Sequence, residues 1–276
     1  MQSRKTVKEI REMKQQGARI SMLTAYDASM ARIFQSCGVD ILLVGDSLGM
    51  VVLGYDSTVP VTMEDMLHHC SAVRRGAPDG FVVGDMPFGS YQVGVEHGVT
   101  NAVRFYKEAG ADAVKLEGGE EVCETVSAVV RAGVPVMGHI GLTPQTAGQS
   151  GGFTVQGKDE SSARRLLHEA RALEEAGAFA VVLECIPAGL AEVISQSLSI
   201  ATIGIGAGSS CDGQVLVSHD LLGMFARFVP RFVKQYADLA PLIEQAVTAY
   251  VKEVGDGSFP DKSHSFSPEK DYSTLL

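Results

Sequence analysis

Short apolar runs alternate along the chain with amphipathic stretches, and many of the amphipathic stretches end in glycine. Eight of the runs are apolar almost throughout and rich in Val, Ile and Leu, which is typical of parallel strands covered on both faces. These predicted strands span residues 18–25, 40–46, 81–86, 112–118, 134–140, 178–185, 200–206 and 213–219.

The segments between the strands have helical periodicity, most clearly in residues 159–177. Asp159 or Ser161 can cap the start of this helix, its leucines form one apolar stripe, and Gly177 can close its end. Two further segments end in the same way, residues 27–38 and 120–133. Repeated strand–helix–glycine units predict right-handed crossovers and a parallel sheet.

Eight strands alternating with helices favour a closed (β/α)₈ barrel, of the TIM-barrel type, over an open doubly wound sheet. Residues 207–212, between the last two strands, are too few for a full helix. No linker divides the chain, so we expect one domain over residues 1–276. Residues 1–17 are predicted to form an N-terminal helix, and the Ser- and Pro-rich residues 256–276 a polar tail.

Composition and charge narrow the class of protein. The chain has 276 residues, of which 45% are apolar and 20% charged, as in a packed globule rather than a disordered or fibrous protein. Its 23 Lys and Arg against 33 Asp and Glu give a net charge of −10, so it lacks the basic surface of a nucleic-acid binder. No apolar run is long enough to span a membrane. We therefore expect a soluble protein with neither a nucleic-acid nor a membrane partner.

The five cysteines and the N-terminus indicate the compartment. The cysteines are odd in number, scattered, and form no Cys-x-x-Cys pair, which favours reduced thiols over disulfides or a zinc site. Residues 1–17 are charged and contain no apolar core, so they do not form a secretory signal. The expectation is a cytoplasmic protein.

Polar side chains interrupt several predicted strands near their carboxyl ends. The six residues are Asp46, Asp85, Lys115, Glu117, His139 and Glu184. In a (β/α)₈ barrel all these strand ends meet at one mouth, the face at which such enzymes carry out chemistry. Residues two apart on a strand point the same way, so Lys115 and Glu117 should share a face. Five strands therefore deliver acids and bases to one rim.

Each of these residues also has a structural interpretation when taken alone. Asp46 and Asp85 could cap a helix or stabilise a turn, since aspartate is common at both places. His139 could be a hydrogen-bonded structural histidine, and Lys115 could simply pair with Glu117. Their convergence on one face favours the functional interpretation.

Glu184 lies between the apolar VVL and CIP segments, where capping is not the obvious role and a bare carboxylate is costly to bury. Acids gathered at one mouth repel one another unless they are protonated or bridged by a cation. Oxygen ligands select a hard ion, Mg²⁺ or Mn²⁺, over zinc. The spacing alone indicates metal-assisted enolisation of a 2-oxo acid, with one carboxylate left to act as the base.

Longer motifs resemble a known family. The segments are VGDSLGMVVLGYDSTVPVTMEDM (44–66), GDMPFGSY (84–91), VKLEGG (114–119), GHIGLTPQ (138–145), VVLECIP (181–187) and IGIGAG (203–208). In this order, from about residue 4 to residue 260, they resemble the ketopantoate hydroxymethyltransferase family of the phosphoenolpyruvate/pyruvate barrel superfamily.

The resemblance implies transfer of a hydroxymethyl group from 5,10-methylenetetrahydrofolate, as co-substrate, to 3-methyl-2-oxobutanoate, giving 2-dehydropantoate in pantothenate and coenzyme A biosynthesis. It also implies a homo-oligomer, commonly a decamer, with one Mg²⁺ per subunit. By motif, Asp46, Asp85 and Glu117 correspond to the metal site. Glu184 corresponds to the catalytic proton acceptor. The substrate-binding positions are Asp46, Ser47, Asp85, Lys115 and, near the substrate, His139.

Three other functions remain open at this point. A lyase of the isocitrate lyase type would share the barrel, but its Lys-Lys-Cys-Gly-His loop is absent from the sequence. A Schiff-base aldolase could use Lys115 but would not need the clustered acids. A metabolite sensor would keep the pocket without the chemistry.

Overall fold

The computed structural model describes residues 4–148, 152, 154–225 and 229–266. The chain divides into two compact units, one formed by residues 1–218 and 230–233, the other by residues 219–229 and 234–276. The first unit contains the barrel and the second contains the last long helix. The prediction of a single domain over residues 1–276 stays a prediction.

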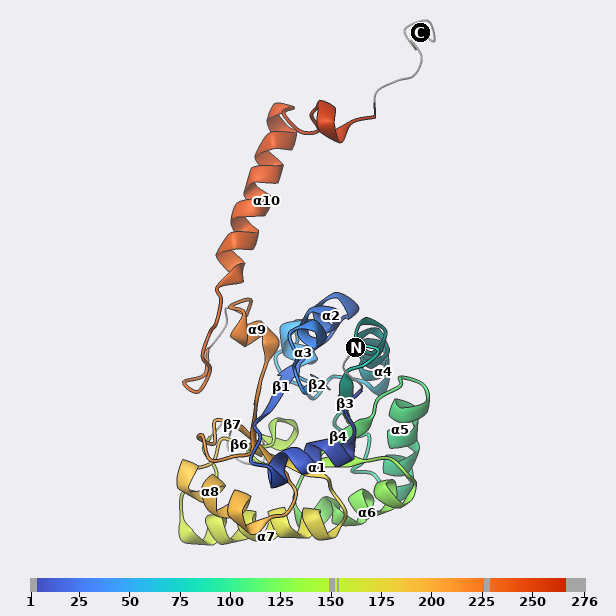
Figure 1. Ribbon diagram of the computed structural model, residues 1–276, viewed down its shortest axis with the longest axis vertical. Helices are drawn as coiled ribbons and strands as arrows, with labels where there is room; N and C mark the ends of the chain where they lie inside the picture. The colour runs from blue at the N-terminus through green and yellow to red at the C-terminus, as the bar shows by residue number, and fades with distance from the viewer. Residues whose placement is uncertain (1–3, 149–151, 153, 226–228, 267–276) are drawn as a thin grey trace, which may run out of the picture. The chain divides into compact units, whose positions relative to one another are not determined.

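Eight parallel strands close into a barrel in chain order, with the last strand paired to the first. This confirms the predicted fold (Figure 1). The strands are β1 (Ile20–Thr24), β2 (Ile41–Val44), β3 (Phe81–Asp85), β4 (Ala113–Glu117), β5 (Val136–Gly141), β6 (Ala180–Glu184), β7 (Ala201–Ile205) and β8 (Gly213–Leu216). Each lies inside the apolar run that predicts it, apart from the final Gly141 of β5.

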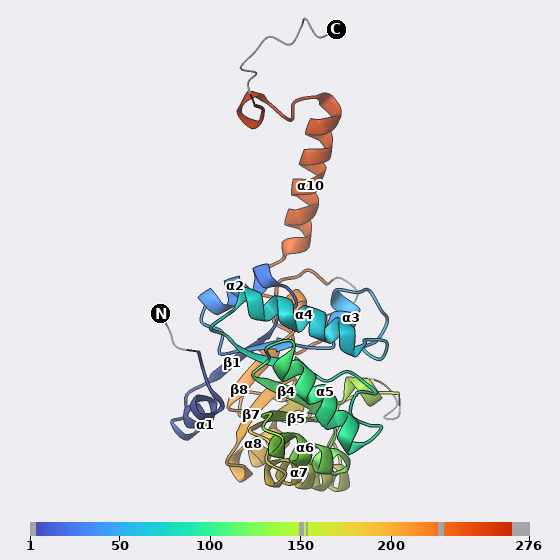
Figure 2. The same cartoon turned by 90° about the vertical axis from the view of Figure 1, so that its right-hand side faces the viewer.

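Helices surround the strands of the first unit (Figure 2). They are α1 (Val7–Gln15), α2 (Ala28–Ser36), α3 (Leu48–Val51), α4 (Met63–Gly76), α5 (Val95–Lys107), α6 (Cys123–Arg131), α7 (Glu160–Glu175) and α8 (Ala188–Ser197). Short 3₁₀ turns cover Glu120–Val122 and Pro144–Thr146. No helix separates β7 from β8 within this described stretch, as the short link predicts.

Side-chain caps explain where several helices begin. Asp159 caps α7 by accepting a hydrogen bond from the Ser162 amide, which decides between the two predicted caps. Thr6 and Glu9 form a reciprocal capping box at the start of α1. The predicted N-terminal helix is therefore shorter than residues 1–17, and residues 1–3 lie outside the described part of the chain.

The second unit contains α10 (Leu239–Asp256), which the sequence analysis does not predict. The short helix α9 (Ser218–Leu221) begins at the last residue of the first unit's main segment. A 3₁₀ turn at Lys262–His264 follows α10, within the predicted polar tail, while residues 267–276 lie outside the described residues. Among the described helices, none is long and apolar enough to cross a membrane.

The barrel interior changes character along the strands. Its apolar cluster takes alternate residues from the amino-terminal part of each strand, such as Phe81 and Val83 of β3 and Ala113 of β4. Ile10 of α1 is fully buried and belongs to the same cluster. Because strand residues alternate between faces, the next inward position of β3 is Asp85. The interior is therefore apolar at one end and polar at the other.

Candidate active site

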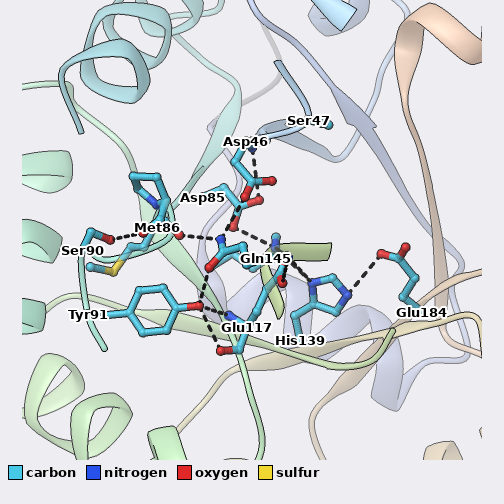
Figure 3. Close-up of polar contacts among 12 residues, drawn as sticks. Asp46, Ser47, Asp85, Met86, Ser90, Tyr91, Glu117, His139, Gln145 and Glu184 are labelled. Atoms are coloured by element: carbon cyan, nitrogen blue, oxygen red, sulfur yellow. Dashed lines mark hydrogen bonds and ion pairs between the residues drawn. The ribbon is translucent and has the colours of Figure 1, made fainter. Parts of the chain in front are cut away.

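The strand-end residues Asp46, Asp85, Glu117, His139 and Glu184 lie together at the carboxyl end of the barrel (Figure 3), and Lys115 contacts three of them. The period-two pattern that builds the apolar core also brings most of them inward: Lys115 and Glu117 follow Ala113 on β4, and Glu184 follows Val182 on β6. Asp46 lies two residues beyond the end of β2 and is brought in by the turn that follows this strand. On neighbouring strands, Glu117 is in register with His139. The sequence prediction that one rim collects these side chains is confirmed in its geometry.

Asp46 and Asp85 are the innermost pair of acids. The Asp46 amide donates a hydrogen bond to Asp85 Oδ2 at 3.3 Å, and the two residues are only 4% and 2% exposed. Burial raises the pKa of Asp46 well above its ordinary value, and the charges of Asp85 and Glu117 raise it further. Burial also raises the pKa of Asp85, although Lys115 opposes this. The pair thus resists carrying two charges without a cation.

Lys115 provides a buried positive charge among these acids. Its Nζ lies 2.7 Å from Asp85 Oδ1, in register on the neighbouring strand β3, and 3.8 Å from Glu117 Oε1, on the same face of β4. Burial lowers the pKa of Lys115, but the carboxylates outweigh it and hold the pKa above its usual range. The ammonium form is therefore the stable one. For Glu117, burial is outweighed by His139 and Lys115, which lower its pKa.

His139 connects this cluster to Glu184. Its Nδ1 lies 3.1 Å from Lys115 Nζ and 3.5 Å from Glu117 Oε1, and its Nε2 lies 3.2 Å from Glu184 Oε2. Burial and Lys115 lower the pKa of His139, but the nearby carboxylates of Glu117 and Glu184 raise it to about 9. The imidazole therefore links the lysine–carboxylate cluster with the acid on β6.

Glu184 is the most accessible acid of this group. Its side chain is 15% exposed, against 2% for that of Glu117. It ends β6, and the next residue, Cys185, has a positive φ of 48°, a backbone conformation that residues other than glycine rarely adopt. The sharp change of direction after Glu184 ends the strand at the barrel mouth.

Ser47 directly follows Asp46 at the start of α3. Its hydroxyl lies 2.9 Å from the hydroxyl of Tyr26 and does not cap the helix. The side chain of Asp46 contacts Gln145 instead of capping α3, so the helix-cap interpretation of Asp46 does not describe its position. The assignment of Ser47 to substrate binding stays a prediction.

Sequence comparison gives the family. Residues 4–262 match the family model described as ketopantoate hydroxymethyltransferase. The chain belongs to this family. A Desulfotalea psychrophila protein named 3-methyl-2-oxobutanoate hydroxymethyltransferase is 63% identical over 273 residues, covering 99% of this chain and 98% of the relative. A Heliobacterium modesticaldum protein of the same name is 59% identical, covering 98% of both chains.

Solved structures support the barrel fold of this ketopantoate hydroxymethyltransferase family member. A 2,3-dimethylmalate lyase of the PEP mutase/isocitrate lyase superfamily gives a TM-score of 0.58 at 17% identity, covering 95% of this chain and 92% of the lyase. A phosphonopyruvate hydrolase in complex with oxalate and Mg²⁺ gives 0.59 at 14% identity, covering 94% and 93%.

Two neutral residues of the site are missed by the sequence analysis. Gln145 lies in the 3₁₀ turn after β5 and donates a hydrogen bond through Nε2 to Asp46 Oδ2 at 2.9 Å. The Tyr91 hydroxyl lies 2.7 Å from Gln145 Oε1. Gln145 ends the GHIGLTPQ motif and Tyr91 ends GDMPFGSY, but a single glutamine or tyrosine in a loop gives no chemical signal of its own.

The charges of the site fit a hard divalent cation. When ionised, its four carboxylates outnumber Lys115 and a protonated His139 by two. Among the described residues, no three His, Cys, Asp or Glu side chains are arranged to hold a metal ion by themselves. Mg²⁺ is commonly held by one or two carboxylates and completed by water and substrate, which suits Asp46 and Asp85. The participation of Glu117 stays a prediction.

Proposed function

We propose that the protein transfers a hydroxymethyl group from 5,10-methylenetetrahydrofolate to 3-methyl-2-oxobutanoate, giving 2-dehydropantoate for pantothenate and coenzyme A biosynthesis. Relatives at 59–63% identity over nearly the whole chain carry the name of this activity. The observation that carries the proposal is the contact chain from Asp46 and Asp85 through Lys115 and His139 to Glu184. It combines a cation-binding acid pair with a separate, accessible base.

Asp46 and Asp85 would hold one Mg²⁺ per subunit, with Glu117 as a further ligand, directly or through water. When bound, this ion supplies a Lewis acid that stabilises negative charge on the keto oxygen of the oxo acid. The raised pKa values of Asp46 and Asp85 support this assignment, because a divalent cation relieves the repulsion that burial imposes on them.

Lys115 would bind the oxo acid through its charge. Its ammonium group is already oriented by Asp85 at 2.7 Å, so it offers remaining N–H donors to the substrate carboxylate without losing that contact. The raised pKa of Lys115 opposes a Schiff-base reaction, because the protonated amine has no free electron pair with which to attack a carbonyl. This separates the proposed reaction from that of a lysine-dependent aldolase.

Glu184 would remove the hydrogen from C3 of the oxo acid. His139 Nε2, at 3.2 Å from Glu184 Oε2, orients the carboxylate and leaves its other oxygen for the substrate. Carbon acids beside a ketone are weak, so the base needs the positive charges of the neighbouring cluster to stabilise the carbanion. The carbanion would then bond to the methylene carbon of the folate as one of the two C–N bonds of that carbon breaks. Water would replace the second folate nitrogen and supply the hydroxyl group, and the C3 proton and one water proton balance the two nitrogens of the released tetrahydrofolate.

The test is product formation by the purified protein. Incubation with 3-methyl-2-oxobutanoate, Mg²⁺ and 5,10-methylenetetrahydrofolate should yield 2-dehydropantoate, followed by NMR. Omission of the folate should stop product formation but still permit exchange of the C3 hydrogen with D₂O. The exposed variant Glu160→Gln is a matched control and should retain both activities. Folded protein that gives neither product nor exchange contradicts the proposal.

The family resemblance also supports a homo-oligomer, a decamer in its commonest form, and a cytoplasmic location. Both belong to the proposal. Sedimentation velocity of the purified chain would measure the oligomeric state, and a monomer at micromolar concentration would contradict the first of the two.

A further inference from the structure

Gln145 lies at the centre of the polar network, between the carboxylates of β2 and β4. It is 4% exposed. Its side-chain Nε2 donates to Asp46 Oδ2 and to the Met86 carbonyl oxygen, both at 2.9 Å. Its backbone amide donates to Glu117 Oε2 at 3.0 Å. One uncharged residue therefore contacts two of the three acids assigned to the metal site (Figure 3).

The surrounding atoms allow the amide of Gln145 only one orientation. Nε2 faces the Met86 carbonyl oxygen, which can only accept hydrogen bonds, and Asp46 Oδ2, which can only accept them when the carboxylate is ionised. On the other side, Oε1 receives the Tyr91 hydroxyl at 2.7 Å and Gln92 Nε2 at 3.3 Å. A flipped amide would set its oxygen against two acceptors and leave them without a donor inside the protein.

Tyr91 is itself held in place by the strand that carries Glu117. Its hydroxyl accepts a hydrogen bond from the Glu117 amide at 3.1 Å and lies 3.0 Å from the Glu117 carbonyl oxygen. Tyr91 is 2% exposed, so neither contact is shared with bulk water. β4 therefore holds the Tyr91 hydroxyl, and this hydroxyl fixes the orientation of the Gln145 amide that donates to Asp46.

The hydrogen bonds of Gln145 occupy one carboxylate oxygen of Asp46 and one of Glu117. Asp46 Oδ2 and Glu117 Oε2 are occupied by neutral N–H donors of Gln145, which leaves Asp46 Oδ1 for a cation or substrate. A neutral donor suits this task, because a second lysine or arginine in its place would compete with a divalent cation for the carboxylates. Outer contacts of this kind commonly alter metal affinity 10–100-fold when they are removed.

We propose that Gln145, oriented by Tyr91, is a positioning residue that holds Asp46 and Glu117 ready to bind the divalent cation and does not itself touch the substrate. This inference rests on the proposed function, because that function assigns the two acids to the metal site.

The experiment measures cation binding without turnover. Mn²⁺, an EPR-visible hard divalent ion, is titrated into wild type, Gln145→Met, Gln145→Glu and Tyr91→Phe. Gln145→Met keeps the length and the backbone amide but removes the side-chain donor, and should weaken Mn²⁺ binding about 10–100-fold. Gln145→Glu also loses the side-chain donor but adds a negative charge that attracts the cation, so it should weaken Mn²⁺ binding less than Gln145→Met does. Tyr91→Phe leaves the amide in place without its partner, so a smaller, severalfold loss is expected.

Activity gives a second measurement that a purely structural role would not change in the same way. In Gln145→Met the Mg²⁺ concentration needed for half-maximal activity should rise with the Mn²⁺ dissociation constant, and saturating Mg²⁺ should recover most of kcat. The exposed glutamine variant Gln16→Glu is the matched control and should bind Mn²⁺ as wild type does. Circular dichroism establishes which variants are folded.

Four results decide between these outcomes. Folded Gln145→Met that binds Mn²⁺ with wild-type affinity overturns the inference while leaving the proposed function intact. If Gln145→Met does not fold, Tyr91→Phe decides, and its unchanged Mn²⁺ affinity overturns the inference. Wild-type protein that forms no 2-dehydropantoate contradicts the proposed function, whereas wild type that forms product but binds no Mn²⁺ overturns this inference alone.

Discussion

Replacing Lys115 by methionine tests the electrostatic balance of the site. Methionine keeps the length of the side chain but removes its charge. Among the described residues, Lys115 is the lysine that pairs with the buried carboxylates of Asp85 and Glu117. With Lys115 gone, these carboxylates remain buried at 2% and 5% exposure, and among the described contacts His139 is the cationic partner left to Glu117. We expect a large loss of stability at pH 7 and a loss of oxo-acid binding.

The magnitude follows from the distances. At an effective dielectric constant of about 20, an ion pair at 2.7 Å gives about 6 kcal/mol of Coulomb attraction and one at 3.8 Å about 4 kcal/mol. The cost of burying the charges offsets much of this attraction, and removing one partner of a buried pair costs about 3–5 kcal/mol in practice. We therefore expect Lys115→Met to lower the free energy of unfolding by about 3–5 kcal/mol. That is a large share of the roughly 5–15 kcal/mol typical of a domain.

Urea unfolding at pH 7 without divalent cations measures this loss, with Asp85→Asn as the second change. The double variant Lys115→Met/Asp85→Asn no longer buries that unpaired carboxylate, so it should regain at least about 2 kcal/mol over Lys115→Met alone. A single variant within about 1 kcal/mol of wild type would refute the reasoning. So would a double variant that is no more stable than the single one.

Two further predictions concern pH and the opposite end of the barrel. Burial raises the folded-state pKa of Asp46 above its unfolded value of about 3.9. The protonated carboxyl therefore contributes to the stability of the folded protein below about pH 4, and this contribution is lost as the pH rises through the folded-state pKa. Mg²⁺ binds the ionised form, so it should raise the melting temperature more at pH 8 than at pH 5; equal shifts by calorimetry would contradict this. Asp212 Oδ2 accepts hydrogen bonds from Lys14 Nζ at 2.8 Å and from the Thr202 amide and hydroxyl at 2.8 and 2.9 Å. Asp212→Ala should therefore lower the free energy of unfolding by about 2–4 kcal/mol, measured by urea unfolding, without changing the kcat of the folded enzyme. A loss of kcat as well, measured by steady-state kinetics, would contradict this prediction.

The strands of this barrel are predictable because each is buried on both faces. A strand in that position must be apolar almost throughout, so runs such as residues 81–86 identify β3 to within a residue. The start of α7 is predictable to within two residues, because a capping side chain before an amphipathic stretch satisfies the free amides of the first helical turn, and the structure selects Asp159 over Ser161. Local chemistry therefore locates these elements from the sequence.

Helix α10 shows where local patterns are insufficient. None of its residues is buried within the described structure, and large apolar residues such as Leu242, Val247 and Val251 remain exposed. Without a buried face, the apolar and polar positions of residues 239–256 do not indicate which side of a helix meets a core. The C-terminal glycine, Gly257 with a φ of 76°, is the clearest local sign of where this helix ends.

The site is partly predictable for a related reason. Charged residues such as Asp85 and Lys115 stand out inside apolar runs, and the alternation of strand residues already places them on the inner face. Gln145 and Tyr91 do not stand out, because neutral polar residues are ordinary in loops. Their importance comes from distances between segments far apart in the chain, such as the 2.9 Å between Gln145 Nε2 and Asp46 Oδ2. Only the folded structure supplies such distances.

Deuterium exchange at C3 of 3-methyl-2-oxobutanoate examines the assignment of Glu184 as the base. In D₂O with Mg²⁺ and no folate, wild-type protein should exchange this hydrogen, and NMR follows the loss of its signal. Glu184→Gln should slow the exchange at least about a hundredfold, the lower range for a general base, while its dissociation constant for the oxo acid changes no more than severalfold. Exchange by folded Glu184→Gln at the wild-type rate would show that another group removes the proton.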